Sequence, residues 1–134
     1  MKRLLLWLRI IRPQTLFASL CPILIGWIIV PTLLWNVALA TLVCGMALQI
    51  LSNLINDLYD FRRGSDKAGR IGFRRALAEG EVTESSMQKV VALTLGIVVA
   101  LGLYLVYIGR WPILVVGVSA IIFAWLYTAT NKSL

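Results

Sequence analysis

The chain has 134 residues, which is enough for one domain at most. Hydrophobic residues make up 60% of it and the mean hydropathy is +0.86, which indicates a membrane protein rather than a soluble globular domain. The net charge of +7 does not indicate nucleic-acid binding, because most basic residues lie in the segments that flank the apolar stretches on one side, as they do in membrane proteins.

Four apolar segments predict an all-α fold, a polytopic membrane bundle with four transmembrane helices. A span needs about 20 apolar residues, and no charged side chain occurs in residues 13–56, 90–109 or 111–131. The basic and apolar residues 1–11 are predicted to lie along the membrane interface before the first span. The predicted helices are residues 15–30, 35–62, 85–107 and 112–128.

Short signals predict where these helices begin, bend and end. Pro13 suits the first turn of a helix, and Pro22 is expected to kink the first span. Gly64 is a plausible end for the second span. Thr83 or Ser85 is expected to cap the third span, and residues 73–79 could form a short interfacial helix.

The basic residues predict the topology. They lie before the first span and in the loop at residues 63–82, whereas the turns on the other side carry only Arg110. By the positive-inside rule, both termini and this loop are expected in the cytoplasm, with the chain in the inner or plasma membrane. Cys21 and Cys44 fall within predicted spans and are interpreted as small packing residues.

The most unusual stretch is residues 53–75, which begins inside the second predicted span and ends in the basic loop. At about 100° per residue, two amides and two carboxylates fall within one arc of roughly 100°. Carboxylates inside a membrane are costly and usually mark a site. Hard oxygen ligands followed by basic residues suit Mg²⁺ and a phosphorylated ligand. The four residues are Asn53, Asn56, Asp57 and Asp60.

Several of these residues have a second interpretation. Asn53 and Asn56 could serve helix packing through hydrogen bonds. Arg62 and Arg63 are interpreted as topology determinants at the interface, and Arg12 as either a membrane anchor or a site residue. The three glutamates of residues 79–84 are interpreted as solvated charges.

The same stretch resembles the first motif of the UbiA superfamily of intramembrane prenyltransferases. In the menaquinone branch of that superfamily the motif reads N-D-x-x-D-x-x-x-G-x-D-x-x-x-R-x-G. The matching positions here are Asn56, Asp57, Asp60, Gly64, Asp66, Arg70 and Gly72. The entry to the first span, residues 12–16, is also similar to the family's first helix, so the resemblance covers nearly the whole chain.

The resemblance implies transfer of a prenyl group from a polyprenyl diphosphate to an aromatic acceptor, with Mg²⁺ as the cofactor. In the menaquinone branch the acceptor is 1,4-dihydroxy-2-naphthoate. Asp57 and Asp60 are then the catalytic and metal-binding acids, and Asp66 is a third metal ligand from the loop. The implied diphosphate-binding residues are Asn53, Asn56, Lys67, Arg70 and Arg74.

The family also has a second aspartate-rich motif, and no aspartate follows Asp66 here. Residues 1–134 are therefore expected to be the N-terminal half of a UbiA-type domain, completed by a missing C-terminal half or by a second copy. The alternative is a non-catalytic membrane helical fragment or half-subunit that needs a partner polypeptide. Tyr127 and Lys132, on the motif's side of the membrane, are weaker candidates for the site.

Overall fold

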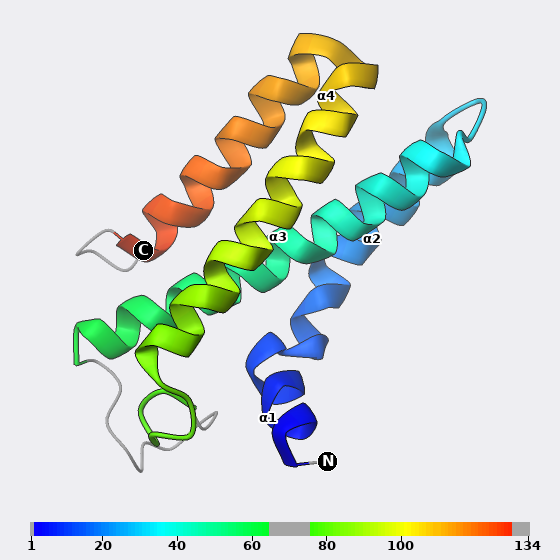
Figure 1. The fold of residues 1–134 in the computed structure, drawn as a ribbon. Coiled ribbons are helices and arrows are strands. Elements are labelled where there is room, and N and C mark those ends of the chain that lie inside the picture. Colours follow the sequence, from blue (N-terminus) through cyan, green and yellow to red (C-terminus); the bar gives the residue numbers. More distant parts are fainter. Residues whose placement is uncertain (1, 65–75, 130–134) are drawn as a thin grey trace.

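The structure, a computed structural model, describes residues 2–64 and 76–129. This part of the chain is all-helical, as the sequence predicts, with α1 (Lys2–Ile11), α2 (Pro13–Ile29), α3 (Trp35–Arg62) and α4 (Glu84–Ala129). α3 is central, because each of the other helices packs against it (Figure 1). The all-α membrane fold is therefore confirmed.

Two of the described helices are long and apolar enough to cross a membrane: α3, and α4 from Glu84 to Phe123. α1 from Leu5 and α2 together would make a third span, bent by 49° where they join. The four spans expected from the sequence count the two parts of α4 separately.

α4 bends sharply at Arg110, whose backbone is not helical (φ 62°, ψ −157°). The chain reverses there, so that residues 84–109 and residues 111–129 run as two arms (Figure 1). Pro112 follows the bend closely, where its missing N–H does not interrupt an established helix. The bend falls within the turn that the sequence predicts at residues 109–112.

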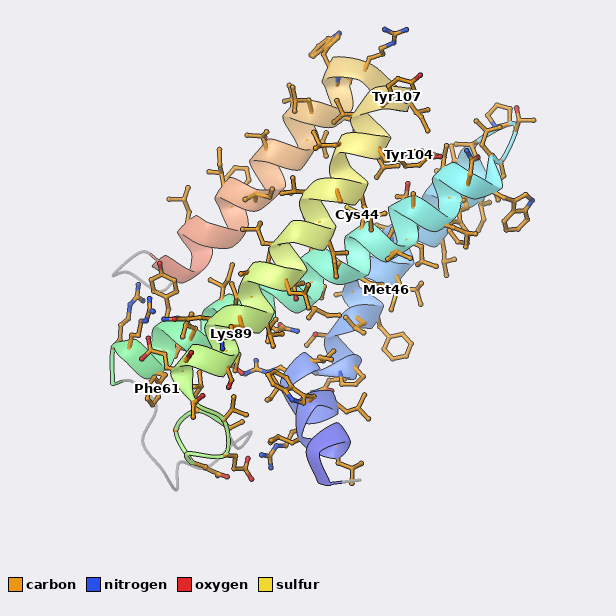
Figure 2. The ribbon with its side chains drawn as sticks, in the orientation of Figure 1. Cys44, Met46, Phe61, Lys89, Tyr104 and Tyr107 are labelled. Atoms are coloured by element: carbon orange, nitrogen blue, oxygen red, sulfur yellow. The ribbon has the colours of Figure 1, made fainter. Side chains whose placement is uncertain are left out.

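α3 and the first arm of α4 pack antiparallel along a narrow stripe. Buried positions on α3 recur at intervals of three and four residues, as they do in coiled coils. Two contacts fix the register: the Cys44 thiol lies 3.9 Å from the Val98 carbonyl oxygen, and the Asn36 amide donates to the Tyr104 hydroxyl at 2.9 Å (Figure 2). The α3 stripe consists of Ala40, Cys44, Ala47, Leu51, Leu54 and Leu58.

A small residue lets α2 approach α3 closely. In lipid the driving force for helix association is close packing, because the surroundings are as apolar as the side chains. α2 approaches α3 at Gly45, where an added methyl group would lie 2.7 Å from Ile23 Cδ1. Every residue of α2 is at least partly exposed, so most of the helix surface stays open to lipid or to a further partner.

Two glycines close the helical segments on either side of the loop. Gly64 (φ 65°) follows the end of α3, as predicted, in a conformation that other residues adopt only at a cost. Gly80 (φ 69°) donates to the Leu77 carbonyl at 3.1 Å, and Glu81 donates to the Ala76 carbonyl at 2.9 Å. This is a Schellman motif, so residues 76–79 form a turn of helical type. The rest of the predicted helix, residues 73–75, lies outside the described residues.

Thr83 is the residue that caps α4. Its hydroxyl accepts a hydrogen bond from the Ser86 backbone N–H at 3.2 Å, as a side chain at the N-cap position does. The sequence leaves Thr83 and Ser85 as alternatives, and the structure selects Thr83.

One hydrophobic cluster holds the end of the bundle that carries the charges. It joins α1, α3, the 76–79 turn and the start of α4, and its buried members are Ile10, Leu54, Leu58, Ala76, Leu77 and Met87. We use the name polar end for this part of the bundle: the hydrophobic cluster and the charged residues 57–63 at the end of α3. Among the described charged residues, only Arg110 lies at the opposite end.

This packing predicts a large difference between two leucine substitutions. Leu54 is completely buried and Leu93 is 66% exposed on the outer face of α4. Leu54→Ala should lower the free energy of unfolding by about 2–5 kcal/mol, because the cavity loses packing contacts. Leu93→Ala should change it by less than about 0.5 kcal/mol. Unfolding in detergent micelles by added SDS, followed by circular dichroism, measures both; equal effects would contradict the observed interface.

Candidate active site

The junction between α1 and α2 lies directly against the polar face of α3. The Arg12 guanidinium donates to Asp57 Oδ1 at 2.5 Å. The Asn53 side-chain amide donates to the Ile11 carbonyl at 3.1 Å and to the Thr15 hydroxyl at 2.8 Å. These contacts connect residues about 40 positions apart in sequence. The site is therefore built jointly by the first two helices and α3.

The junction itself has an unusual backbone. Arg12 adopts the left-handed conformation (φ 55°, ψ 69°), which costs a residue with a side chain about 1–2 kcal/mol. Pro13 follows it as the first residue of α2, and the Thr15 hydroxyl and backbone N–H both contact the Arg12 carbonyl at 2.9 Å. The surrounding hydrogen bonds hold this strained conformation, a pattern that is frequent at functional sites.

Asp57 is buried at the centre of this arrangement. Its side chain is 6% exposed, and that of Arg12 is 19% exposed. A carboxylate can be buried only with compensating partners, because removing its charge from water is costly. Arg12 supplies one such partner. Arg12 therefore contacts a candidate site residue, which favours the second of the two roles that the sequence leaves open for it.

The other motif residues on α3 are less enclosed. Asn56 and Asp60 are half-buried, and Asp60 lies one helical turn beyond Asp57, towards the end of α3. Asn53 is buried, and its contacts with Ile11 and Thr15 show that it joins two helices. Packing through interhelical hydrogen bonds, one of its two interpretations, is thus observed for Asn53.

Arg62 and Arg63, at the end of α3, contact other residues of the polar end. Arg62 Nε donates to Glu84 Oε1 at 2.7 Å, which links the end of α3 to the start of α4. Arg63 lies over the Tyr59 ring, with its guanidinium carbon 5.9 Å from the ring centroid. Both arginines are exposed. Their end of the bundle is the one at which Figure 2 labels Phe61 and Lys89. The described contacts of these two arginines are thus with Glu84 and Tyr59.

Glu81 forms a second link across the polar end. It accepts a hydrogen bond from Arg9 of α1 and so ties α1 to the turn that precedes α4. Glu81 and Glu84 are solvated, as the sequence predicts, and Glu84 begins α4; in addition, both are paired with arginines. Such partly exposed pairs contribute about 0–1 kcal/mol each. They position segments more than they stabilise the fold.

The loop candidates lie outside the described residues. These are Asp66, Lys67, Arg70 and Arg74. Tyr127 is within α4, but its side chain is also outside the described set, as is Lys132. Their assignments remain predictions from the sequence.

The described residues fit a divalent cation such as Mg²⁺ in donor type. Asp57 and Asp60 are two carboxylates one turn apart on one helix, and Asn53 and Asn56 add amide groups. Mg²⁺ commonly keeps several waters and takes one or two carboxylates together with phosphate oxygens. Within residues 2–64 and 76–129 there is no group of three acidic, cysteine or histidine side chains that could hold a metal alone. A cation here would therefore also need water, the ligand or loop residues.

Sequence reasoning missed the part that α1 and α2 play. Thr15 and the Ile11 carbonyl hold Asn53, and neither belongs to the aspartate motif. The sequence signals at this point are Pro13, the open role of Arg12 and the resemblance at residues 12–16. None of them indicates that Ile11 and Thr15 hold Asn53.

Comparison with known proteins identifies a family and several relatives. The model of the UbiA prenyltransferase family matches residues 15–133. A protein named 1,4-dihydroxy-2-naphthoate octaprenyltransferase from Escherichia coli is 36% identical over 94% of this chain and 44% of its own length. The proteins of that name from Bacillus subtilis and Mycobacterium leprae are 32% and 35% identical, over 92% and 94% of this chain.

The chain spans less than half the length of these curated relatives, between 40% and 44%. No solved structure matches it.

The junction predicts that Asn53 matters for stability as well as position. Asn53→Leu should lower the free energy of unfolding by about 1–3 kcal/mol, because the Ile11 carbonyl and the Thr15 hydroxyl lose a buried partner. Asn36→Leu removes an exposed hydrogen bond to Tyr104 and should cost less than about 1 kcal/mol. SDS unfolding of the two variants side by side tests this, and a larger loss for Asn36→Leu would be the contrary result.

Proposed function

Because the chain belongs to the UbiA prenyltransferase family, we propose that it serves transfer of a prenyl group from a polyprenyl diphosphate to 1,4-dihydroxy-2-naphthoate. The observation that carries the proposal is Asp57, a carboxylate buried at the polar end of an apolar bundle with Asp60 one turn away. The names of the three relatives support the acceptor and the polyprenyl donor.

The reaction requires the bond between the allylic carbon and the diphosphate oxygen to break. The bonding electron pair leaves with the diphosphate, and a carbon of the aromatic ring forms a bond to the allylic cation. That ring carbon then loses the group it carried, either a proton or the carboxylate as CO2, and the electron pair of the broken bond restores the aromatic ring. Mg²⁺, when bound, supplies charge stabilisation to the leaving diphosphate. Asp57 and Asp60 are the residues that would hold it, with Asp66 added from the loop by resemblance.

The other residues position and enclose the reactants. Asn53 fixes the α1–α2 junction beside Asp57, and Asn56 lies on the same face of α3. Lys67, Arg70 and Arg74 are proposed to bind the diphosphate, since arginine and lysine suit phosphate oxygens. The apolar helix walls would receive the prenyl tail and keep water from the cation.

We propose further that these residues form one half of the active domain. The fraction of the relatives that the chain covers supports this, as does the open surface of α2. A second half or a second copy would supply the opposite wall of the site. The alternative is a non-catalytic helical fragment or half-subunit, which the same coverage favours for residues 1–134 by themselves.

The same proposal includes an orientation. The start of α1, the end of α3 and both ends of α4 lie towards the polar end, and the α2–α3 turn and the α4 bend lie towards the other end (Figure 1). The positive-inside rule assigns the polar end to the cytoplasm of a cell whose inner or plasma membrane holds the protein.

The first test is enzymatic. Membranes containing residues 1–134 together with the remaining segment of the Escherichia coli relative should prenylate 1,4-dihydroxy-2-naphthoate in a Mg²⁺-dependent way. Residues 1–134 alone should not, because one aspartate motif leaves the diphosphate open to water, which weakens electrostatic contacts. Asp57→Asn or Asp60→Asn should lower the rate at least about 100-fold, on the scale of losing one catalytic electrostatic contact.

Arg62→Gln is the matched control for this assay. It removes a charge at the same end of α3, but its partner is Glu84 rather than Asp57, so activity should fall less than about threefold if Arg62 makes no contact with the reacting groups. Full activity of an Asp57→Asn, Asp60→Asn double variant would show that these two carboxylates take no part in the reaction. Turnover by residues 1–134 alone would show that two copies can form a complete site.

The orientation has a separate test. On a background without Cys21 and Cys44, Ser65→Cys should react with a membrane-impermeant maleimide only after the membrane is opened. Thr32→Cys, in the turn between α2 and α3, should react from outside in intact cells. The reverse labelling would overturn the proposed topology and, with it, the side on which the substrates bind.

A further inference from the structure

Arg12 binds the carboxylate of Asp57, the same group that the proposed function assigns to a metal ion. Its guanidinium lies 2.5 Å from Asp57 Oδ1, inside the bundle. We propose that Arg12 competes with the divalent cation for Asp57, so that the ligand-free protein holds its own positive charge in the cation's place. This inference rests on the proposed function, because it concerns the same carboxylate.

The backbone holds Arg12 in this position from both sides. Asn53 binds the carbonyl of Ile11, the residue before it, and the Thr15 hydroxyl three residues after it. The left-handed conformation of Arg12 itself turns the chain between α1 and α2. The contact between Arg12 and Asp57 is therefore fixed by the backbone and is not a chance pairing of two surface side chains. The placement of Arg12 is specified by the same residue, Asn53, that lies one turn before Asp57 on α3.

Charge sets Arg12 and a divalent cation in competition for Asp57. A divalent cation bound to this carboxylate would lie within a few ångströms of the guanidinium, and like charges at that distance repel strongly where water is scarce. Arg12 must therefore move aside when the cation binds. Its side chain is 19% exposed, against 6% for Asp57, so the arginine is the partner with access to the surface.

The displaced guanidinium then needs an anion. The proposed substrate brings one, because its diphosphate arrives with the cation and arginine binds phosphate oxygens well. A metal ion alone would have to displace Arg12 without that compensation, so the site should bind the cation weakly until the diphosphate is present. Arg12 acts here as a positioning residue that couples the two binding events.

The test uses the 134-residue chain in lipid nanodiscs and Mn²⁺ alone, which favours the same oxygen ligands as Mg²⁺ and is counted by electron paramagnetic resonance. Arg12→Gln should bind Mn²⁺ about tenfold more tightly than the unchanged chain, because one charged hydrogen bond no longer competes. Arg12→Lys keeps the charge and should stay within about threefold of the unchanged chain. Asp57→Asn should abolish the binding in every background.

Arg62→Gln is the matched control, since it removes the same charge from the same end while its partner is Glu84. It should change the Mn²⁺ affinity less than about twofold, because exposed charges are well screened. Equal tightening by Arg12→Gln and Arg62→Gln would mean a general effect of net charge and would overturn the competition. Unchanged or weaker binding by a fully helical Arg12→Gln chain would overturn it as well.

A second measurement needs no substitution at Arg12 and covers the case in which Arg12→Gln loses its helicity. In the unchanged chain labelled with ¹⁵N-arginine, saturating Mg²⁺ should shift the Arg12 side-chain Nε–H signal and leave the Arg62 signal in place. An Arg12 signal that does not move while Mg²⁺ is bound contradicts the proposal. If Asp57→Asn leaves Mn²⁺ binding unchanged, the metal role of Asp57 in the proposed function fails; if only the Arg12 effects are absent, that role stands and the competition alone fails.

Discussion

A single buried carboxylate constrains how this bundle is put together. Asp57 lies on a helix that is apolar over most of its length, at a depth where its side chain is almost inaccessible. Such a group is tolerated only where partners replace the water it has lost. One such partner is Arg12, which lies at the junction between α1 and α2 and has a strained backbone. The packing of α1 and α2 against α3 therefore depends on the charge of Asp57.

The apolar contacts explain why this constraint can be met. The stripe on α3 faces α4, and the cluster at the polar end joins α1, α3 and the turn before α4. Together they place the α1–α2 junction on one side of α3 and the start of α4 on another. The residues that face neither neighbour stay exposed, which suits a protein surrounded by lipid. Hydrophobic packing thus sets the frame, and hydrogen bonds set the orientation of the polar groups within it.

Much of this could be predicted from the sequence, and the reasons are local. α3 has the bounds predicted for it, residues 35–62, because a turn precedes the helix and Gly64 follows its last residues. The shared face of Asn53 and Asp57 follows from helical periodicity. The Arg12–Asp57 pair could not be predicted, because the residues are 45 positions apart and several other cations lie near the same end. The pairing depends on the register between α1, α2 and α3, which no single helix encodes. The same applies to Glu81 and Glu84, whose arginine partners depend on which helix ends meet.

The Arg62–Glu84 pair and the Gly80 turn have a consequence for how this family can diversify. They hold the two ends of the segment between α3 and α4 at fixed points on the bundle. The helices have already brought those ends together, so the entropy of closing the segment depends only weakly on its length, at about 0.6 kcal/mol for each doubling. Insertions or exchanges between Gly64 and Ala76 would therefore perturb the helical frame little. The basic residues proposed to bind the diphosphate could then change while Asp57 and its partners stayed in place, so ligand specificity could evolve separately from the fold.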